Sequence, residues 1–150
     1  MSGKDVAKFH HEITYYASAE AVYNALTDPR ELSRMMRSPA TSDPKVGGAF
    51  SYMDGVITGI YTALEPSKTL EMQWRMKGWA DQCYSTVRIK LTSEAAGVCT
   101  LELDQQGIPI RDKFGNGGTD RVTVEGWKQR ILVVGLSRMI GFAIRAEDED

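Results

Sequence analysis

The segment TLEMQWRMK, from Thr69 to Lys77, alternates between polar and apolar side chains without interruption. Successive side chains of a β-strand point to opposite faces of its sheet, so this spacing predicts a strand with one buried and one solvated face. A strand of this kind must pair with neighbouring strands, which limits the chain to folds built on a sheet. The predicted buried face carries Leu70, Met72, Trp74 and Met76.

Four further segments around it have the composition and length of strands. They read AFSYM (49–53), VITGIYTAL (56–64), CYSTVRIKL (83–91) and VCTLELDQQ (98–106). Short turn sequences lie between them. Asp54-Gly55 suits the positive dihedral angles of a tight hairpin, and EPSK (65–68) places proline at the second position of a turn. Five consecutive strands joined in this way predict an antiparallel meander with one dry and one wet face.

Two short helices are predicted before this meander. A strand from Phe9 to Ala17, rich in threonine, tyrosine and isoleucine, leads into the first helix, which Ser18 can cap. Asp28 followed by Pro29 begins the second helix, because aspartate is a favoured cap and proline is favoured at the first helical position. This helix is expected to end near Arg37.

A long helical stretch follows the meander. It begins near Asp120 or Thr123 and runs for about twenty-five residues on the three-and-four spacing of apolar side chains. Its predicted apolar stripe is Val124, Trp127, Ile131, Val134 and Met139. A long helix and a curved meander bury each other's apolar faces when the sheet wraps around the helix. The order β-α-α-β-β-β-β-β-α therefore predicts an α+β fold of the helix-grip type, with a curved antiparallel sheet of about six strands.

The composition fits one ordinary globular domain. We expect this domain to occupy residues 1–146 and a solvated acidic tail, EDED, to occupy residues 147–150. The net charge is −2 at pH 7, which gives no sign of a nucleic-acid-binding surface. The longest apolar stretch, 131–144, is too short to span a bilayer and contains Arg138, so no membrane association is expected. The start of the chain has no signal-like apolar run and there are only two cysteines, so a cytoplasmic location is expected.

No catalytic or metal-binding set can be assembled from the reactive residues. His10 and His11 are adjacent in a predicted strand, so their side chains point to opposite faces and cannot share a metal ion. Cys99 is predicted to face the core, and Cys83 has no assignable acid–base partner. The segment FGNGG (114–118) lacks the following Lys-Ser or Lys-Thr of a phosphate-binding loop. We therefore expect a protein without an active site, a metal ion or a cofactor.

One group of side chains faces the predicted interior. Its members are Phe50, Tyr52, Met72, Trp74, Met76, Trp127 and Ile131. Core packing is the preferred interpretation, because aromatic and methionine side chains fill irregular gaps between a sheet and a helix. The alternative is a pocket for an apolar ligand between the sheet and the helix.

A second group lies near the predicted outer face and the turn at Gly78; it comprises Arg75, Lys77 and Trp79, with Arg88 as a further candidate. An exposed tryptophan beside an arginine is typical of interface hot spots. A half-buried tryptophan in a turn is equally common, so composition leaves both interpretations open.

Several motifs in consecutive order carry a resemblance to a known family. They are SPAT (38–41), GGAFSYMDG (47–55), GIYTALEPSKTLEMQWRMKGW (59–79), GIP (107–109) and GW (126–127). The chain resembles the C-terminal domain of the activator of heat shock protein 90 ATPase over about Phe9 to Ile144, and MQWRMKGW (72–79) is the most specific element. Members of this family have the helix-grip fold of START-like and birch-pollen-allergen-like proteins, which agrees with the fold predicted from the strand and helix pattern.

The resemblance implies a non-enzymatic co-chaperone that binds heat shock protein 90 and raises its ATP turnover. In two-domain members an N-terminal domain docks on the middle segment of the chaperone, and the C-terminal domain touches its dimerised N-terminal domains. The sequence given shows no motif of that N-terminal module, so we expect either an isolated C-terminal domain or a natural single-domain member, and we favour the single-domain member. The expected contact residues are Arg75, Lys77 and Trp79, with Arg111 and Lys113 in the glycine-rich connection as weaker candidates.

A different class of function remains open beside this one. Relatives of the same fold include proteins that bind small molecules, so the chain could instead be a START-like carrier of an apolar ligand. The combination of MQWRMKGW with GIP favours the chaperone activators over the carriers.

Overall fold

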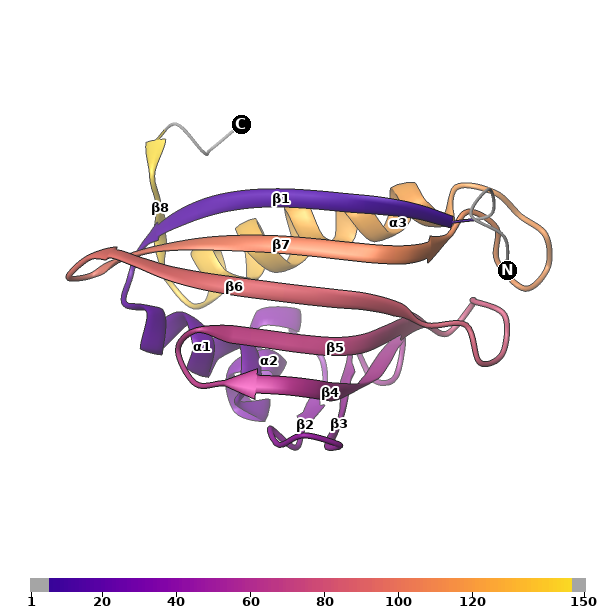
Figure 1. Ribbon diagram of the computed structural model, residues 1–150, viewed down its shortest axis with the longest axis horizontal. Helices are drawn as coiled ribbons and strands as arrows, with labels where there is room; N and C mark the ends of the chain where they lie inside the picture. Colours follow the sequence, from indigo (N-terminus) through magenta and orange to yellow (C-terminus); the bar gives the residue numbers. More distant parts are fainter. Residues whose placement is uncertain (1–5, 147–150) are drawn as a thin grey trace.

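A computed structural model describes residues 6–146 and shows a large antiparallel sheet curved around a long C-terminal helix (Figure 1). The sheet has the strand order β2-β3-β4-β5-β6-β7-β1-β8. The strands are β1 (Val6–Tyr16), β2 (Thr41–Ser42), β3 (Ala49–Tyr52), β4 (Ile57–Glu65), β5 (Thr69–Met76), β6 (Ser85–Ala95), β7 (Val98–Pro109) and β8 (Ala143–Ile144). The helices are α1 (Ala19–Thr27), α2 (Pro29–Met36), α3 (Thr119–Glu125) and η2 (Gly126–Met139), which continues α3. The predicted α+β, helix-grip fold is confirmed. The predicted acidic tail, 147–150, lies outside the described residues.

Both predicted helix starts are present. At the start of α1, the side chain of Ser18 accepts a hydrogen bond from the backbone N–H of Ala21 (3.1 Å). At the start of α2, Asp28 accepts one from the backbone N–H of Arg30 (2.8 Å). The helix α2 stops where Arg37 adopts the left-handed conformation at φ 52°. These caps fix where the chain turns between β1 and the meander.

The predicted five-strand meander is confirmed as β3 to β7. Along β5, the side chains of Leu70, Met72 and Trp74 are buried and those between them are half-buried. The strands β6 and β7 alternate in the same way over most of their length. The turn between β3 and β4 has the positive φ angles expected of Asp54 and Gly55, at 52° and 89°. The alternation therefore gives both the strands and the face that each side chain occupies.

The sheet has two more strands than the six predicted. The strands β2 and β8 are two residues long each, and they extend opposite edges of the sheet by pairing with β3 and with the end of β1. A two-residue strand has no alternation that a sequence pattern can detect. The strand β8 forms because Gly141, at φ 103°, turns the chain back, and the helix therefore ends at Met139, earlier than predicted.

The C-terminal helix changes its hydrogen-bonding pattern along its length. From Gly126 it is a π-helix, in which each N–H bonds to the carbonyl five residues earlier. The bond from Ile140 to Gly135, which closes its last turn, is 3.0 Å long. The buried positions of this helix follow one face of the wider turn. They are Trp127, Ile131, Leu132, Gly135 and Leu136.

The predicted apolar stripe of this helix is therefore only partly right. Trp127 and Ile131 are buried, but Val124, Val134 and Met139 are half-exposed. The prediction assumed an ordinary helical spacing, and the π-helix rotates the later positions away from the sheet.

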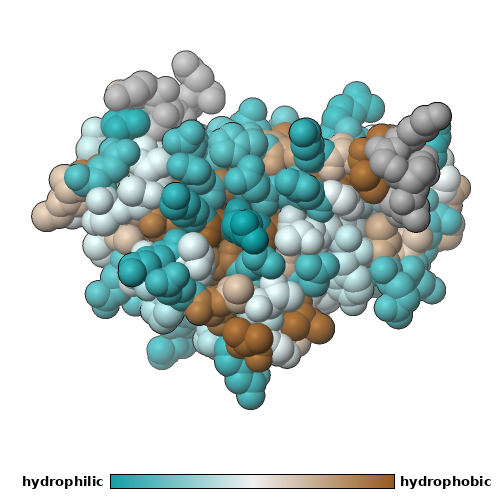
Figure 2. All heavy atoms as spheres, in the orientation of Figure 1, coloured by the Kyte–Doolittle hydropathy of each residue, from teal (hydrophilic) through white to brown (hydrophobic). Residues whose placement is uncertain are grey.

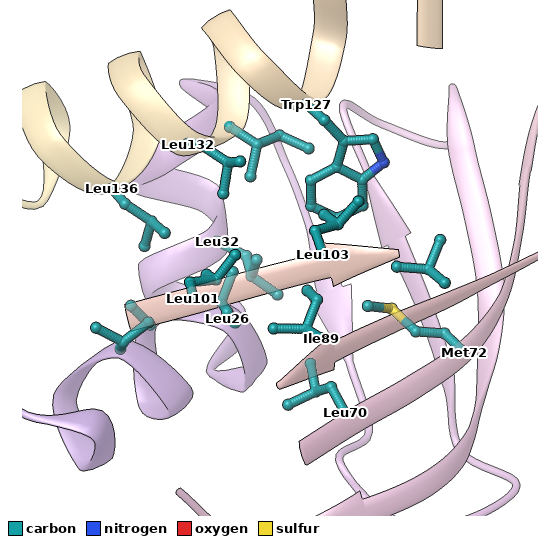
Figure 3. Close-up of a cluster of buried hydrophobic side chains, with 14 of the residues drawn as sticks. Leu26, Leu32, Leu70, Met72, Ile89, Leu101, Leu103, Trp127, Leu132 and Leu136 are labelled. Atoms are coloured by element: carbon teal, nitrogen blue, oxygen red, sulfur yellow. The ribbon is translucent and has the colours of Figure 1, made fainter. Parts of the chain in front are cut away.

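The core lies between the concave face of the sheet and the helices (Figure 3). The side chains labelled there come from α1, α2, η2 and strands β5 to β7. They are Leu26, Leu32, Leu70, Met72, Ile89, Leu101, Leu103, Trp127, Leu132 and Leu136. The opposite, outer face of the sheet is mostly hydrophilic, with hydrophobic side chains gathered at its lower edge (Figure 2).

Candidate partner-binding surface

The guanidinium group of Arg75 is used inside the molecule. It leaves the end of β5 and donates hydrogen bonds to the carbonyl oxygens of Trp79 and Ala80, both at 3.0 Å. It also lies over the ring of Tyr84, 5.8 Å from its centre. Arg75 thus holds the connection between β5 and β6 in place through two of its N–H donors.

Composition left open whether Trp79 is an exposed contact or a half-buried turn residue, and the structure places its side chain in the core. Its side chain is 1% exposed and packs on Trp74, with 5.6 Å between ring centres. The turn after β5 causes this: the N–H of Trp79 donates to the carbonyl of Met76 (3.0 Å), so the chain reverses and the alternation of the strand ends. Trp74 also packs on Trp127 at 5.9 Å. The three indoles form one buried cluster beneath the end of the sheet.

Lys77 and Lys113 are brought to the same surface by two backbone hydrogen bonds. The N–H of Lys113 donates to the carbonyl of Gly78 (2.9 Å), and the N–H of Lys77 donates to the carbonyl of Val56 (2.8 Å). Three segments that are distant in sequence therefore meet at the right of Figure 1. We call this surface the loop end; it comprises residues 53–56, 77–84 and 110–118 and the start of α3. Both lysine side chains are exposed there.

The connection between β7 and α3 is held by its own hydrogen bonds. The carboxylate of Asp112 accepts from the backbone N–H groups of Asn116 and Phe114, both at 2.9 Å. These bonds hold the pKa of Asp112 below its ordinary value, and the bond from Asn116 has the largest effect. The exposed Arg111 donates to the carbonyl of Gly115 (3.1 Å). The loop is thus ordered before any partner arrives, which lowers the entropic cost of binding.

Exposed apolar side chains concentrate at the loop end. Among residues 6–146, seven large hydrophobic side chains are exposed, and four of these belong to this surface. Phe114 is the most exposed of them at 76%, and the ammonium group of Lys113 lies 5.4 Å from the centre of its ring. The other three are Val56, Tyr84 and Val122. Exposed apolar groups gathered beside cations are typical of protein-binding surfaces.

A cleft of about 970 Å³ opens beside the loop end, between the β3–β4 turn, β5 and the helix formed by α3 and η2. Of the side chains predicted to line a cavity, four lie in this cleft: Trp74, Met76, Trp127 and Ile131. The other three, Phe50, Tyr52 and Met72, are buried in the core away from it. Phe50 packs instead on Tyr52 and Tyr61, with 5.1 Å between ring centres in each pair.

The rim of this cleft carries charges that sequence analysis did not single out. Arg121, Glu125 and Arg130 line it. Neither arginine has a hydrogen bond or an ion pair within the part of the chain that the structure describes. The helical spacing of these residues could have placed them on one face of α3 and η2, but only the fold shows that this face borders a cleft.

The reactive side chains form no catalytic arrangement in residues 6–146. No group of three histidine, cysteine, aspartate or glutamate residues there could hold a metal ion. Burial raises the pKa of both thiols, Cys83 and Cys99, which keeps them protonated. His10 is exposed and bonds to Asp104, 2.7 Å away on the outer face of the sheet.

Comparison with known families gives this surface its context. A family model described as "Activator of Hsp90 ATPase homolog 1-like protein" matches residues 16–132. The chain belongs to this family. The human activator of 90 kDa heat shock protein ATPase homolog 1 is 28% identical over 132 residues, which are 88% of this chain and 36% of the human protein. Mouse homolog 2 is 31% identical over 93 residues, or 62% of this chain and 28% of that protein. The chain thus spans about a third of the length of the curated relatives it matches.

Solved structures of other proteins are also similar to this chain. An HSP90 activator from Plasmodium falciparum superposes with a TM-score of 0.89 at 31% identity, covering 92% of this chain and 99% of that one. The Aha1 dimer from Colwellia psychrerythraea gives a TM-score of 0.70 at 18% identity, covering 90% and 98%. CalU16 from Micromonospora echinospora gives 0.67 at 22% identity, covering 90% and 80%. The last two show a shared fold.

Among residues 6–146, no helix is both long enough and apolar enough to cross a bilayer.

Proposed function

We propose that this protein is a non-enzymatic co-chaperone that binds heat shock protein 90 in the cytoplasm and stimulates its ATPase activity. The observation that supports this most strongly is the similarity to the Plasmodium falciparum HSP90 activator, which extends over 92% of this chain and 99% of that one. The family match over residues 16–132 supports the same function.

In this proposal the domain favours the closed, ATP-committed state of the chaperone. A binding protein shifts such an equilibrium only by its difference in affinity for the two states. The domain must therefore contact surfaces of the chaperone that come together on closure. A rigid contact surface suits this task, because little binding free energy is then spent on ordering the domain itself.

The loop end is the proposed contact surface. Lys77, Arg111 and Lys113 supply exposed positive charge there, and Phe114 supplies an apolar contact. Arg75 and Trp79, which the sequence suggested as contacts, have a supporting role in this proposal. They hold the β5–β6 connection and the indole cluster beneath the surface.

The test is the ATP turnover of purified heat shock protein 90 with increasing amounts of this chain. A chaperone-specific inhibitor subtracts background hydrolysis. Saturable stimulation would support the activator function and would show that a chain of this length suffices. Binding without stimulation would reduce the role to docking. If the chain neither binds the chaperone nor stimulates its ATPase activity, the proposal is contradicted.

A second candidate function is the carriage of a small apolar ligand. The observation that favours it is the cleft of about 970 Å³, lined by Trp74, Met76, Trp127 and Ile131. Its size lies within the range of small-molecule sites. Native mass spectrometry of the purified protein tests this candidate: a co-purified molecule that displaces on unfolding supports it, and a bare protein mass counts against it.

A further inference from the structure

Two exposed valines border the cleft, one from the β3–β4 turn and one from α3. Val56, in the β3–β4 turn, is 43% exposed, and Val122, in α3, is 59% exposed. The indoles of Trp74 and Trp127 line the same cleft. These indoles are each only 1% exposed and form the floor of an open groove, whose solvated apolar surface is supplied by the two valines. Covering that exposed apolar surface with a partner gains free energy.

The charge of the cleft is opposite in sign to that of the whole protein. Two arginines and one glutamate line it, Arg121, Arg130 and Glu125, which gives a net charge of +1. The whole chain carries −2. Neither guanidinium is paired within residues 6–146, so both have donors free for an incoming carboxylate. A partner that carries apolar side chains and acidic groups at its edge would match this pattern.

The apolar surface continues beyond the cleft. A smaller pocket of about 250 Å³ shares Val56 and Val122 with it and extends to Gly78 and Thr119 at the loop end. Phe114 stands exposed on the same loop end. A small molecule inside the cleft would leave Phe114 uncovered, whereas a polypeptide segment crossing from the cleft to the loop end would cover the whole surface.

We propose that the cleft docks an acidic amphipathic segment of the partner protein, with apolar side chains between Val56 and Val122 and carboxylates against Arg121 and Arg130. The inference rests on the proposed function, in which this partner is heat shock protein 90, and it names the feature of the partner that is recognised. Grooves that take one apolar face of a helix are a recurring mode of peptide recognition. The unpaired arginines then select an acidic helix over a basic one.

The first experiment measures chaperone binding by titration calorimetry. Arg121→Glu/Arg130→Glu should weaken binding by about tenfold or more, because it removes two favourable charge contacts and adds two repulsive ones. The matched control is Lys90→Glu/Arg138→Glu, which changes net charge equally at exposed sites outside the cleft and should bind like the wild type. Arg121→Lys/Arg130→Lys should retain most of the affinity. If the wild type binds and the reversed variant binds equally well, the inference is overturned and the proposed function stands.

The second experiment does not depend on the chaperone. A synthetic amphipathic peptide, with leucines on one face and glutamates at its edges, is titrated into the full chain while tryptophan fluorescence is followed. Because Trp74 and Trp127 line the cleft, a saturable change is expected, absent with the lysine counterpart of the peptide and with Arg121→Glu/Arg130→Glu. A response to the peptide without chaperone binding would overturn only the proposed function. No response to the glutamate peptide, or a small molecule found tightly bound in the cleft, would overturn the inference.

Discussion

The backbone N–H of Lys113 donates to the carbonyl oxygen of Gly78 across 2.9 Å, and this bond joins the β7–α3 connection to the β5–β6 connection. The bond places two lysines, Lys77 and Lys113, on one surface although they lie far apart in the sequence. It also places Phe114 beside them, on a loop held by Asp112. A surface assembled in this way from separate connections keeps its shape only as long as the underlying sheet is intact.

Reversal of both lysines tests the loop end as a contact surface. Lys77→Glu/Lys113→Glu should weaken binding to heat shock protein 90 by about tenfold, since exposed charges at an interface act on encounter and on register. The free energy of unfolding should change by less than about 0.5 kcal/mol, because both side chains are exposed. Binding at several salt concentrations checks the mechanism: the difference from the wild type should shrink as salt screens the charges. An unaltered affinity at low salt would show that the contact surface lies outside the loop end.

Trp79 and Phe114 should give opposite results when each is replaced by alanine. Trp79→Ala leaves a cavity beside Trp74 and should lower the free energy of unfolding by about 3–5 kcal/mol. Phe114→Ala should leave stability within about 0.5 kcal/mol and weaken chaperone binding, because the ring is 76% exposed. Urea denaturation and calorimetric titration of both variants check this pair. A stable Trp79→Ala protein would contradict the buried position of that indole.

Arg75 should matter to stability more directly than to binding. Arg75→Gln removes donors from the carbonyl oxygens of Trp79 and Ala80, and we expect a loss of about 1–2 kcal/mol in the free energy of unfolding. Denaturant titration at neutral pH measures it. Lys77→Gln, in the same turn but with an exposed side chain, is the control and should be neutral within about 0.5 kcal/mol. Equal stability of the two variants would mean that the hydrogen bonds of Arg75 do not stabilise the β5–β6 connection.

The meander and both caps could be predicted because they depend on local pattern. Alternation over β5 identifies the buried side chains, and the caps at Ser18 and Asp28 are each satisfied within three residues. The position of Trp79 depends instead on where the alternation ends. Three residues after Met76 it would point outward in a continued strand, and the turn there returns it to the core. A pattern that ends cannot show where the next side chain points.

The cleft could be anticipated only in part for a similar reason. Trp74 and Trp127 were recognisable as inward-facing side chains. Phe50 lies on the same face of the sheet as Trp74, yet it is outside the cleft. Which inward-facing residues border empty space depends on how far the helix stands from each strand. That distance is set by the π-helical geometry of η2 and by its contacts with α2, which no short sequence pattern encodes.

Gly59 should not tolerate a side chain. A Cβ atom there would lie 2.0 Å from the carbonyl oxygen of Gln73 and 2.4 Å from the ring of Phe50, and the backbone atom cannot move aside. Gly59→Ala should therefore cost about 1–3 kcal/mol or more in the free energy of unfolding. Gly126→Ala is the matched control, because its added Cβ would meet no atom within 4 Å beyond its chain neighbours and the backbone of its own helix, and its helical backbone accepts alanine. Thermal unfolding compares the two, and a Gly59→Ala protein as stable as the control would contradict the close packing of β4 on β5.

The pair of His10 and Asp104 should give the protein a small, directional dependence on pH. Nδ1 of His10 lies 2.7 Å from Oδ1 of Asp104, and this hydrogen bond, with weaker contributions from Glu12 and Glu102, raises the pKa of His10 above its ordinary value of 6.5. Folding thus favours the protonated imidazole. The stabilisation is fully present below pH 6.5 and is lost as the pH rises through the folded-state pKa.

Asp104→Asn should remove most of that stabilisation. The wild type should exceed the variant in free energy of unfolding at roughly pH 5.5, and the difference should shrink by roughly pH 8.5, where the histidine is neutral in both folded and unfolded chains. The gain is modest because both side chains are about half exposed and solvent screens the pair. Urea denaturation at the two pH values gives the difference, and NMR titration of the His10 ring gives its cause. A wild-type pKa of His10 at or below 6.5, or a difference that grows with pH, would show that the contact with Asp104 does not persist in solution.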